Sequence, residues 1–242
     1  MLGLGNSLIT TGGLSEVLPS EISGLAIWYK NNTGVAVGQW DDSSGNGRHA
    51  VQADADEQAA VSGGGLSFDG ADPEDHYAVT ESTGYVNPGG TNAFTIAFVA
   101  TREGGDGDDN AIIAGSYNDE YLGFLDEEFV TFRSQDASNF TFATDTWVSS
   151  TQWLFTVTKD TSGNFLFWKN GVSVTPTSTS GTIPNTITDF NAVKLFGARP
   201  PGDSTSSFTW DGIIYEFVMY DTQLTGNDLA NLNSYLTSKF GL

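Results

Sequence analysis

The feature that most constrains this fold is a two-residue alternation of large apolar side chains in several short segments. The clearest cases are Phe94–Ala100 and Trp153–Lys159, in which three alternate positions carry Phe, Ile, Trp or Val. Successive side chains of a strand point to opposite faces of its sheet. The alternation therefore predicts strands with one face in a core and the other nearer solvent, as in antiparallel sheets.

Turn residues separate these strands from further candidates. Residues 160–164 divide two aromatic runs and are expected to form a hairpin loop, and Asn170-Gly171 supplies two positions that tolerate positive φ. The 29 glycines and 7 prolines are typical of many short strands joined by tight turns. The other predicted strands are residues 25–30, 111–114, 121–125, 129–133, 165–169, 193–197 and 213–220.

One amphipathic helix is expected at the end of the chain. Its apolar positions recur at helical spacing and are Leu229, Leu232, Leu236 and Phe240. Thr225, with Asp228 three residues later, resembles a capping box at the start of this helix. We expect the apolar stripe to pack on the sandwich.

The chain divides into a short arm and one domain. Residues 18–242 show no internal repeat and no linker, and they are expected to form a single all-β domain. Residues 1–17 begin with small, flexible and apolar residues that have no clear period. They predict an N-terminal arm that docks on a partner through Met1, Leu2, Leu4 and Leu8. The alternative is a strand or strap on its own domain.

Charge and composition exclude several classes of partner. Nine Lys and Arg against thirty Asp and Glu give a formal net charge of −21, which repels nucleic-acid phosphates and anionic membranes. The absence of cysteine excludes disulfides and thiolate metal sites. The first residues lack the basic and apolar regions of a signal peptide, and no stretch approaches the ~18 apolar residues of a membrane span. An extracellular role would therefore be reached by another route, such as release in a virus particle.

An ordered set of short motifs runs along the chain. The motifs, in order, are GLAIWYK from Gly24, WDDSSGNG from Trp40, LSFDG from Leu66, FTIAFVA from Phe94, FLFWKNG from Phe165, KLFG from Lys194, WDGIIYE from Trp210 and YLTSKFGL from Tyr235. The set resembles the laminin-G-like jelly rolls of the concanavalin-A-like lectin and glucanase superfamily, over residues 18–242. The resemblance implies a two-sheet antiparallel jelly-roll sandwich of about 12 to 14 strands with a short C-terminal helix. The Met-Leu-Gly-Leu-Gly-Asn start is similar to that of virion structural proteins of marine bacteriophages.

The sequence argues against catalysis. Glycosidases hold two carboxyl groups on either side of the scissile bond, and the Glu-x-Asp-x-x-Glu strand of the glucanases is absent. The consecutive acids at residues 126–128 would point to opposite faces of a strand. Glu216 occupies a position for which the resemblance implies an architectural role. His49 and His76 lack a nucleophile motif or a helical partner, and are interpreted as ordinary exposed histidines.

No cofactor is required by this interpretation, and calcium is the one that the sequence suggests. Carboxylate and carbonyl oxygens are concentrated in residues 103–110, where the candidate ligands are Asp106, Asp108, Asp109 and Asn110. The alternative is a solvated turn, since Asp-Gly pairs also form plain turns. The loop is not an EF-hand, because the twelfth position from Asp106 is Tyr117. A second, weaker acidic cluster contains Asp69, Asp72, Glu74 and Asp75.

The tryptophans divide into core residues and one candidate for sugar stacking. Trp147 follows a polar run and is the glycan-binding candidate, because sugars stack on exposed aromatic rings beside hydrogen-bonding groups. Residues 41–47 look like a site but are interpreted as a turn that maintains the fold. The remaining tryptophans fall in strand contexts and are expected in the core: Trp28, Trp40, Trp153, Trp168 and Trp210.

These observations predict a non-catalytic, virion-associated structural or decoration protein with a lectin-like fold that mediates surface attachment. Its expected partners are other virion or assembly proteins, including copies of itself. The first alternative is a glycan-binding adhesin or tail-fibre receptor-binding module that uses loops at the end of the sandwich. A glycan-degrading enzyme is the second alternative.

Overall fold

The computed structural model describes residues 16–70, 76–80, 93–103, 111–115, 121–125, 128–133, 139–141, 150–175, 178–179, 194–196 and 210–242. These residues form two antiparallel sheets and one α-helix at the C-terminal end, α1 (Gly226–Phe240). Two short 3₁₀ helices, η1 (Pro19–Glu21) and η2 (Ala55–Glu57), lie in connections. The predicted all-β sandwich with a short C-terminal helix is confirmed.

The first sheet has eight strands in the described residues. Its order is β15 (Val172–Val174), β14 (Phe165–Lys169), β13 (Trp153–Lys159), β8 (Phe94–Ala100), β18 (Asp211–Tyr220), β6 (Gly65–Asp69) and β5 (Ala60–Ser62). The eighth strand, β1 (Leu25–Tyr29), pairs with the second half of β18, while β6 pairs with its first half.

The second sheet contains ten strands among the residues described. Their order is β16 (Ser178–Thr179), β12 (Asn139–Thr141), β11 (Glu128–Arg133), β10 (Tyr121–Leu125), β9 (Ala111–Gly115), β17 (Lys194–Leu195), β7 (Tyr77–Val79), β4 (Ala50–Val51), β3 (Gln39–Trp40) and β2 (Val35–Ala36). The total of eighteen exceeds the 12 to 14 strands predicted. The excess arises because five strands have only two residues, too few to give a periodic signal.

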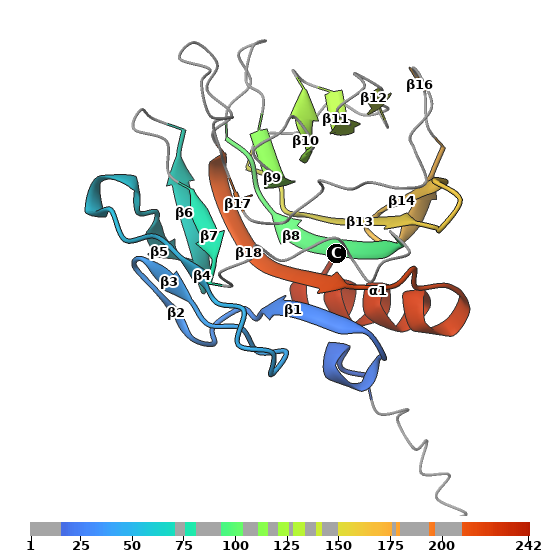
Figure 1. Ribbon diagram of the computed structural model, residues 1–242, viewed down its shortest axis with the longest axis horizontal. Helices are drawn as coiled ribbons and strands as arrows, with labels where there is room; N and C mark the ends of the chain where they lie inside the picture. The colour runs from blue at the N-terminus through green and yellow to red at the C-terminus, as the bar shows by residue number, and fades with distance from the viewer. Residues whose placement is uncertain are drawn as a thin grey trace, which may run out of the picture.

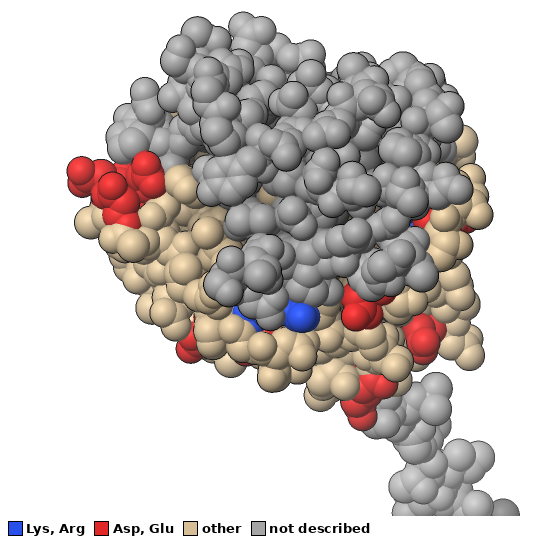
Figure 2. Space-filling view, in the orientation of Figure 1, with Lys and Arg blue, Asp and Glu red and all other residues tan. Residues whose placement is uncertain are grey.

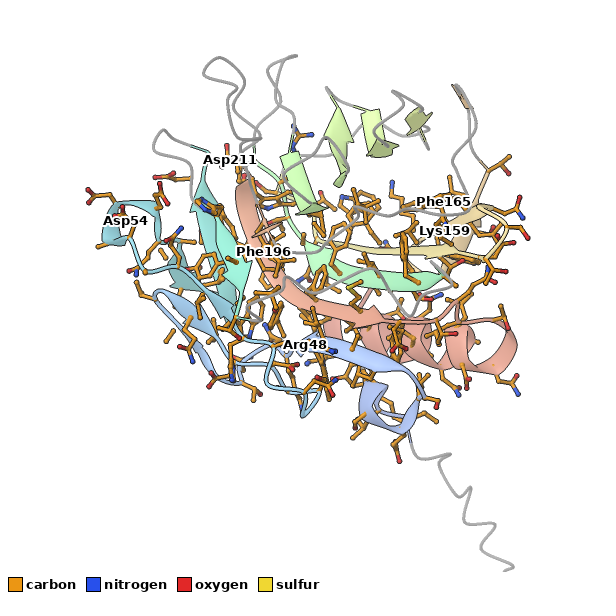
Figure 3. All side chains as sticks on the ribbon, viewed as in Figure 1. Arg48, Asp54, Lys159, Phe165, Phe196 and Asp211 are labelled. Carbon is orange, nitrogen blue, oxygen red and sulfur yellow. The ribbon has the colours of Figure 1, made fainter. Side chains whose placement is uncertain are left out.

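Every predicted strand is found within two residues of its predicted bounds. The most shortened is 193–197, where β17 covers only Lys194–Leu195. Phe196 leaves the extended region, with a φ of 62°, and its N–H donates to the carbonyl of Ile113. Its ring is fully buried between the sheets (Figure 3). Packing of this ring therefore ends the strand early.

The eight-stranded sheet is covered on both faces. Phe94, Ile96 and Phe98 of β8 enter the core between the sheets, as the alternation predicted. Ala97 and Val99 of the same strand belong to a second cluster formed with α1, which lies on the outer face of this sheet (Figure 1). The prediction that one face lies nearer solvent is wrong for β8, because the helix shields that face.

The helix begins and ends close to the predicted residues. Leu229, Leu232 and Leu236 are buried against the sheet, as expected. Thr225 is the N-cap residue, but its side chain makes no capping hydrogen bond, so the predicted capping box is wrong. The next residue, Gly226, has a φ of 54°, so the chain does not enter the helix in regular N-cap geometry.

Candidate functional site

The site residues chosen from the sequence lie outside the described residues. This applies to Trp147, to the calcium candidates Asp106, Asp108, Asp109 and Asn110, and to the docking residues Met1, Leu2, Leu4 and Leu8. Calcium binding, sugar stacking on Trp147 and docking of the arm therefore stay predictions. Within the part that is described, no group of three or more His, Asp or Glu is arranged to hold a metal ion. The only α-helix described there is too short and too polar to span a bilayer.

The polar loop at residues 41–47 is held by one carboxylate. Asp42 accepts hydrogen bonds from the backbone N–H groups of Trp28 (3.0 Å), Ser44 (2.9 Å) and Arg48 (3.0 Å). It also accepts from the hydroxyl of Ser44 at 2.7 Å. Burial of Tyr29 and, second, the negative charge of Asp42 raise the pKa of the Tyr29 hydroxyl. These bonds serve the loop itself, which supports the interpretation of this motif as a turn.

Glu216 is fully buried and joins α1 to the sheet. Its carboxylate accepts from Trp28 Nε1 at 2.8 Å and from Lys239 Nζ at 2.5 Å. The backbone N–H of Asn31 (3.3 Å) and the hydroxyl of Tyr235 (3.4 Å) donate to the same group. Burial and the adjacent carboxylate raise the pKa of Tyr235. The geometry supports the architectural role that the sequence resemblance implied.

The two histidines contact acidic side chains. His49 Nδ1 lies 3.1 Å from a carboxylate oxygen of Asp41, and His76 Nδ1 lies 3.6 Å from Glu57. Both residues are half-buried rather than exposed, which corrects the sequence interpretation. His49 belongs to the β3–β4 connection and lies against Asp41 of the same connection, whereas His76 precedes β7 and lies against Glu57 of η2.

A groove lies where the β14–β15 hairpin meets α1, on the outer face of the eight-stranded sheet (β14 and α1 in Figure 1). Its volume is about 470 Å³. The hairpin contributes Trp168, Asn170, Gly171 and Val172, and the helix contributes Gly226, Leu229, Ala230, Asn233, Ser234 and Thr237. We call this the hairpin–helix groove.

Local sequence explains the shape of the hairpin wall. Asn170 and Gly171 have φ values of 49° and 76°, and this pair of positive values is what a tight two-residue hairpin turn requires. The predicted turn is confirmed. A Cβ at Gly171 would lie 3.8 Å from Asn233 and from Thr237, so the turn approaches the helix to van der Waals distance. The hairpin and helix therefore meet at this end of the groove.

Strand β13 fixes both walls. The side-chain oxygen of Asn170 accepts from the N–H of Leu154 at 2.8 Å, while the Asn170 N–H donates to the Leu154 carbonyl. On the helix side, Thr156 Oγ1 donates to the side-chain oxygen of Asn233 at 2.7 Å. Leu154 and Thr156 share the outer face of β13, since they are two residues apart. One strand therefore sets the spacing of the two amides.

This arrangement leaves two amide donors for a ligand. A backbone N–H can only donate, so the oxygen of the Asn170 amide must face Leu154 and its NH₂ group must face away. Asn233 is 7% exposed, and its oxygen is likewise engaged. Among the described residues neither NH₂ group has a hydrogen-bond partner. Neither NH₂ nitrogen is among the described buried atoms that lack a partner, so both reach solvent and can donate to water or to a ligand.

The other lining groups are apolar or hydroxyl-bearing. Trp168 is half-buried and borders the cluster beneath α1, and Ser234 exposes its hydroxyl to solvent. None of the described residues that line the groove is ionisable. The groove therefore offers one indole ring, two amide donors and hydroxyl groups, but no acid, base or nucleophile pair.

Sequence reasoning missed this groove. Trp168 was assigned to the core, yet it is only half-buried, because α1 covers the sheet up to β13 and leaves the β14 edge partly open. Trp153 is half-buried too, with Lys169 Nζ 3.6 Å from its ring centre. The available signal was the Trp-Lys-Asn-Gly run, which places an aromatic ring two residues before an amide at a tight turn.

Comparison with known proteins gives fold relatives only. Neither protein-family models nor curated protein sequences gave a match. Among solved structures, the chain is similar to Trypanosoma rangeli sialidase in complex with sialic acid, with a TM-score of 0.60 and 14% identity. It is also similar to the binding domain of botulinum neurotoxin serotype C1 (TM-score 0.61, 19% identity) and to that of botulinum neurotoxin DC in complex with rat synaptotagmin II (0.60, 16%).

These likenesses show the fold. The matches cover 88–90% of this chain, but only 33% of the sialidase and 52–53% of the toxin domains. The chain thus spans about a third to a half of the proteins it resembles. The fold they share with it is a lectin-like jelly-roll β-sandwich.

Proposed function

We propose that this chain is a non-catalytic carbohydrate-binding module for attachment, and that the hairpin–helix groove is its binding site. The observation that carries the proposal is the pairing of the Trp168 indole with two fixed amide donors in an uncharged groove. Shallow sites that bind sugars need a flat apolar ring and directional hydrogen bonds, because a sugar has both C–H faces and hydroxyl edges. The lectin-like fold agrees with this proposal.

The composition of the groove supports binding without catalysis. Hydrolysis of a glycosidic bond needs two carboxyl groups at the reacting centre. The described residues lining this groove include none. Glu216, the fully buried acid of β18, is held by four donors within the protein and serves the contact between helix and sheet.

This geometry favours the glycan-binding alternative over a purely structural decoration role.

Location on a virus particle remains part of the proposal, and its support is the resemblance of the sequence to virion proteins. Antibodies raised against the chain should label purified particles if this is right. Deleting residues 1–13 tests the docking arm, since a truncated protein that still joins the particle would show that the arm is not needed.

A glycan array followed by calorimetric titration tests the binding site. We expect retention of at least one glycan class, with Trp168→Ala weakening binding by roughly 2 kcal/mol, about 30-fold, as for a central aromatic contact. The matched control is Leu166→Ala, because Leu166 is 49% exposed on the same strand and does not line the groove. Equal loss in both variants, or no glycan retained by the wild type, would refute the proposal.

A further inference from the structure

The charge of the hairpin–helix groove restricts which glycans it can accept. Its described lining contains no Lys, Arg or His, although amide NH₂ groups could donate to any acceptor oxygen. Anionic sugars carry a carboxylate or a sulfate, which loses hydration on binding unless a cation replaces it. The groove provides hydrogen bonds but no such cation.

The two cations nearest in sequence are held elsewhere. Lys169 follows Trp168, so strand alternation places it on the opposite face of β14, where its Nζ lies over the Trp153 ring. Lys239 is bound to Glu216 at 2.5 Å. Moving either one into the groove would break a contact that the fold uses.

The remaining cations whose side chains are described are also engaged or buried. Lys30 Nζ lies 4.8 Å from the Trp28 ring centre, and Arg48 donates to the carbonyl of Ala26 at 3.0 Å. Arg102 and Lys159 are buried. Figure 2 shows acidic side chains at several places on the described surface, together with some Lys or Arg atoms near the lower centre of this face.

The protein as a whole adds a repulsive field. A formal net charge of −21 disfavours the approach of an anion from a distance, and salt screens this effect over about 10 Å at 0.1 M. A neutral sugar is not repelled by this net charge, and it carries no anionic group that would need a cation in the groove. The two effects therefore act in the same direction.

We infer that the hairpin–helix groove selects uncharged glycans and rejects sialylated and sulfated forms of the same glycan. This inference rests on the proposed function, because it specifies the ligand of the same site. It also distinguishes this chain from the structural relative that was solved with sialic acid.

The test uses an array that carries the same core glycans in neutral, sialylated and sulfated forms, probed with the full chain at 50 mM and 500 mM NaCl. We expect each retained neutral glycan to bind at least about tenfold more tightly than its anionic forms at 50 mM NaCl. High salt should narrow but not remove this difference. Equal or tighter binding of anionic forms, lost in Trp168→Ala, would overturn the inference while leaving the proposed function intact. Absence of binding to every glycan would instead overturn the proposed function.

A gain-of-function pair locates the selectivity. Ala230→Lys places a cation in the groove on an exposed helical position, and should improve binding of the sialylated form by about tenfold relative to the neutral form. Val61→Lys is the control, because Val61 is 43% exposed on β5, at the opposite edge of the same sheet. Both variants change the net charge equally. Improvement in both, or in neither, would show that the groove does not determine the selectivity.

Discussion

The buried contact between Lys239 and Glu216 allows a quantitative test of how α1 is held on the sheet. Glu216 is 0% exposed, while the Lys239 side chain is 23% exposed. Lys239→Met keeps the packing of the aliphatic stem but leaves a buried carboxylate with weaker neutral donors. Removing one partner of a buried pair costs roughly 3–5 kcal/mol, and we expect about 3 kcal/mol here because three donors remain. Glu216→Gln should cost less, about 1–2 kcal/mol, since the freed ammonium group can reach water.

The assay is guanidinium denaturation of the full chain, with both single variants and the double variant in one cycle. A loss of about 3 kcal/mol corresponds to a fall in Tm of roughly 6–12 °C for a chain of this length. The double variant should lose at least about 1 kcal/mol less than the sum of the single variants. Lys30→Met is the control, because within the described part of the chain the Lys30 ammonium group lies over the face of the Trp28 ring and forms no ion pair, and we expect a loss below about 1 kcal/mol. Equal losses in Lys30→Met and Lys239→Met would refute the assigned role of the ion pair.

Three further predictions concern single residues of the fold. Asp42→Ala removes the acceptor of three backbone N–H groups and should lower the free energy of unfolding by about 3 kcal/mol, measured by thermal unfolding. At Asp160, partial burial alone would raise the pKa, but hydrogen bonds donated within the turn hold it below its usual value of 3.8. Because a lowered pKa stabilises the fold above the unfolded pKa, the stability advantage over Asp160→Asn should be full at pH 7. This advantage should vanish as the pH falls through the pKa of the folded state. Denaturation at pH 7 and at a pH below that pKa measures the difference. Gly212→Ala would place a Cβ 2.3 Å from the carbonyl of Thr101 at a φ of 132°, and should prevent folding or lower the free energy of unfolding by more than about 3 kcal/mol. The control is Gly45→Ala, at a φ of 90° with nothing within 4 Å, which should lower it by roughly 1 kcal/mol. Unfolding followed by circular dichroism measures both.

The elements that sequence reasoning predicted well carry their own periodicity. β10 and β14 have the predicted bounds, and α1 contains the predicted apolar stripe. In each case the signal is local, because burial of one face imposes a period of two or of 3.6 on the same segment. The Asn170-Gly171 turn was predictable for the same reason, since positive φ values favour these residue types.

The elements that were missed depend on contacts between distant segments. Phe196 shortens β17 because its ring fills the space beside Tyr29 and Phe217, which come from strands far away in the sequence. The two-residue strands are defined by their hydrogen bonds to neighbouring strands, several of which are themselves only two or three residues long. The half-buried state of Trp168 likewise depends on how much of the sheet is covered by α1, a helix that begins some sixty residues later in the sequence. No window of sequence contains that information.

Strand β13 connects the stability of this fold to its proposed binding site. It pairs with β8 and β14 in the sheet, and its outer face supplies Leu154 and Thr156, which orient the two amides of the groove. Thr156 also ties the middle of α1 to the sheet, while Lys239 ties its C-terminal end. A change that loosens the helix would therefore move one groove wall relative to the other. Because both donors must reach the same ligand, the groove requires a firmly docked helix, which gives the buried ion pair a functional reason to exist in addition to its structural one.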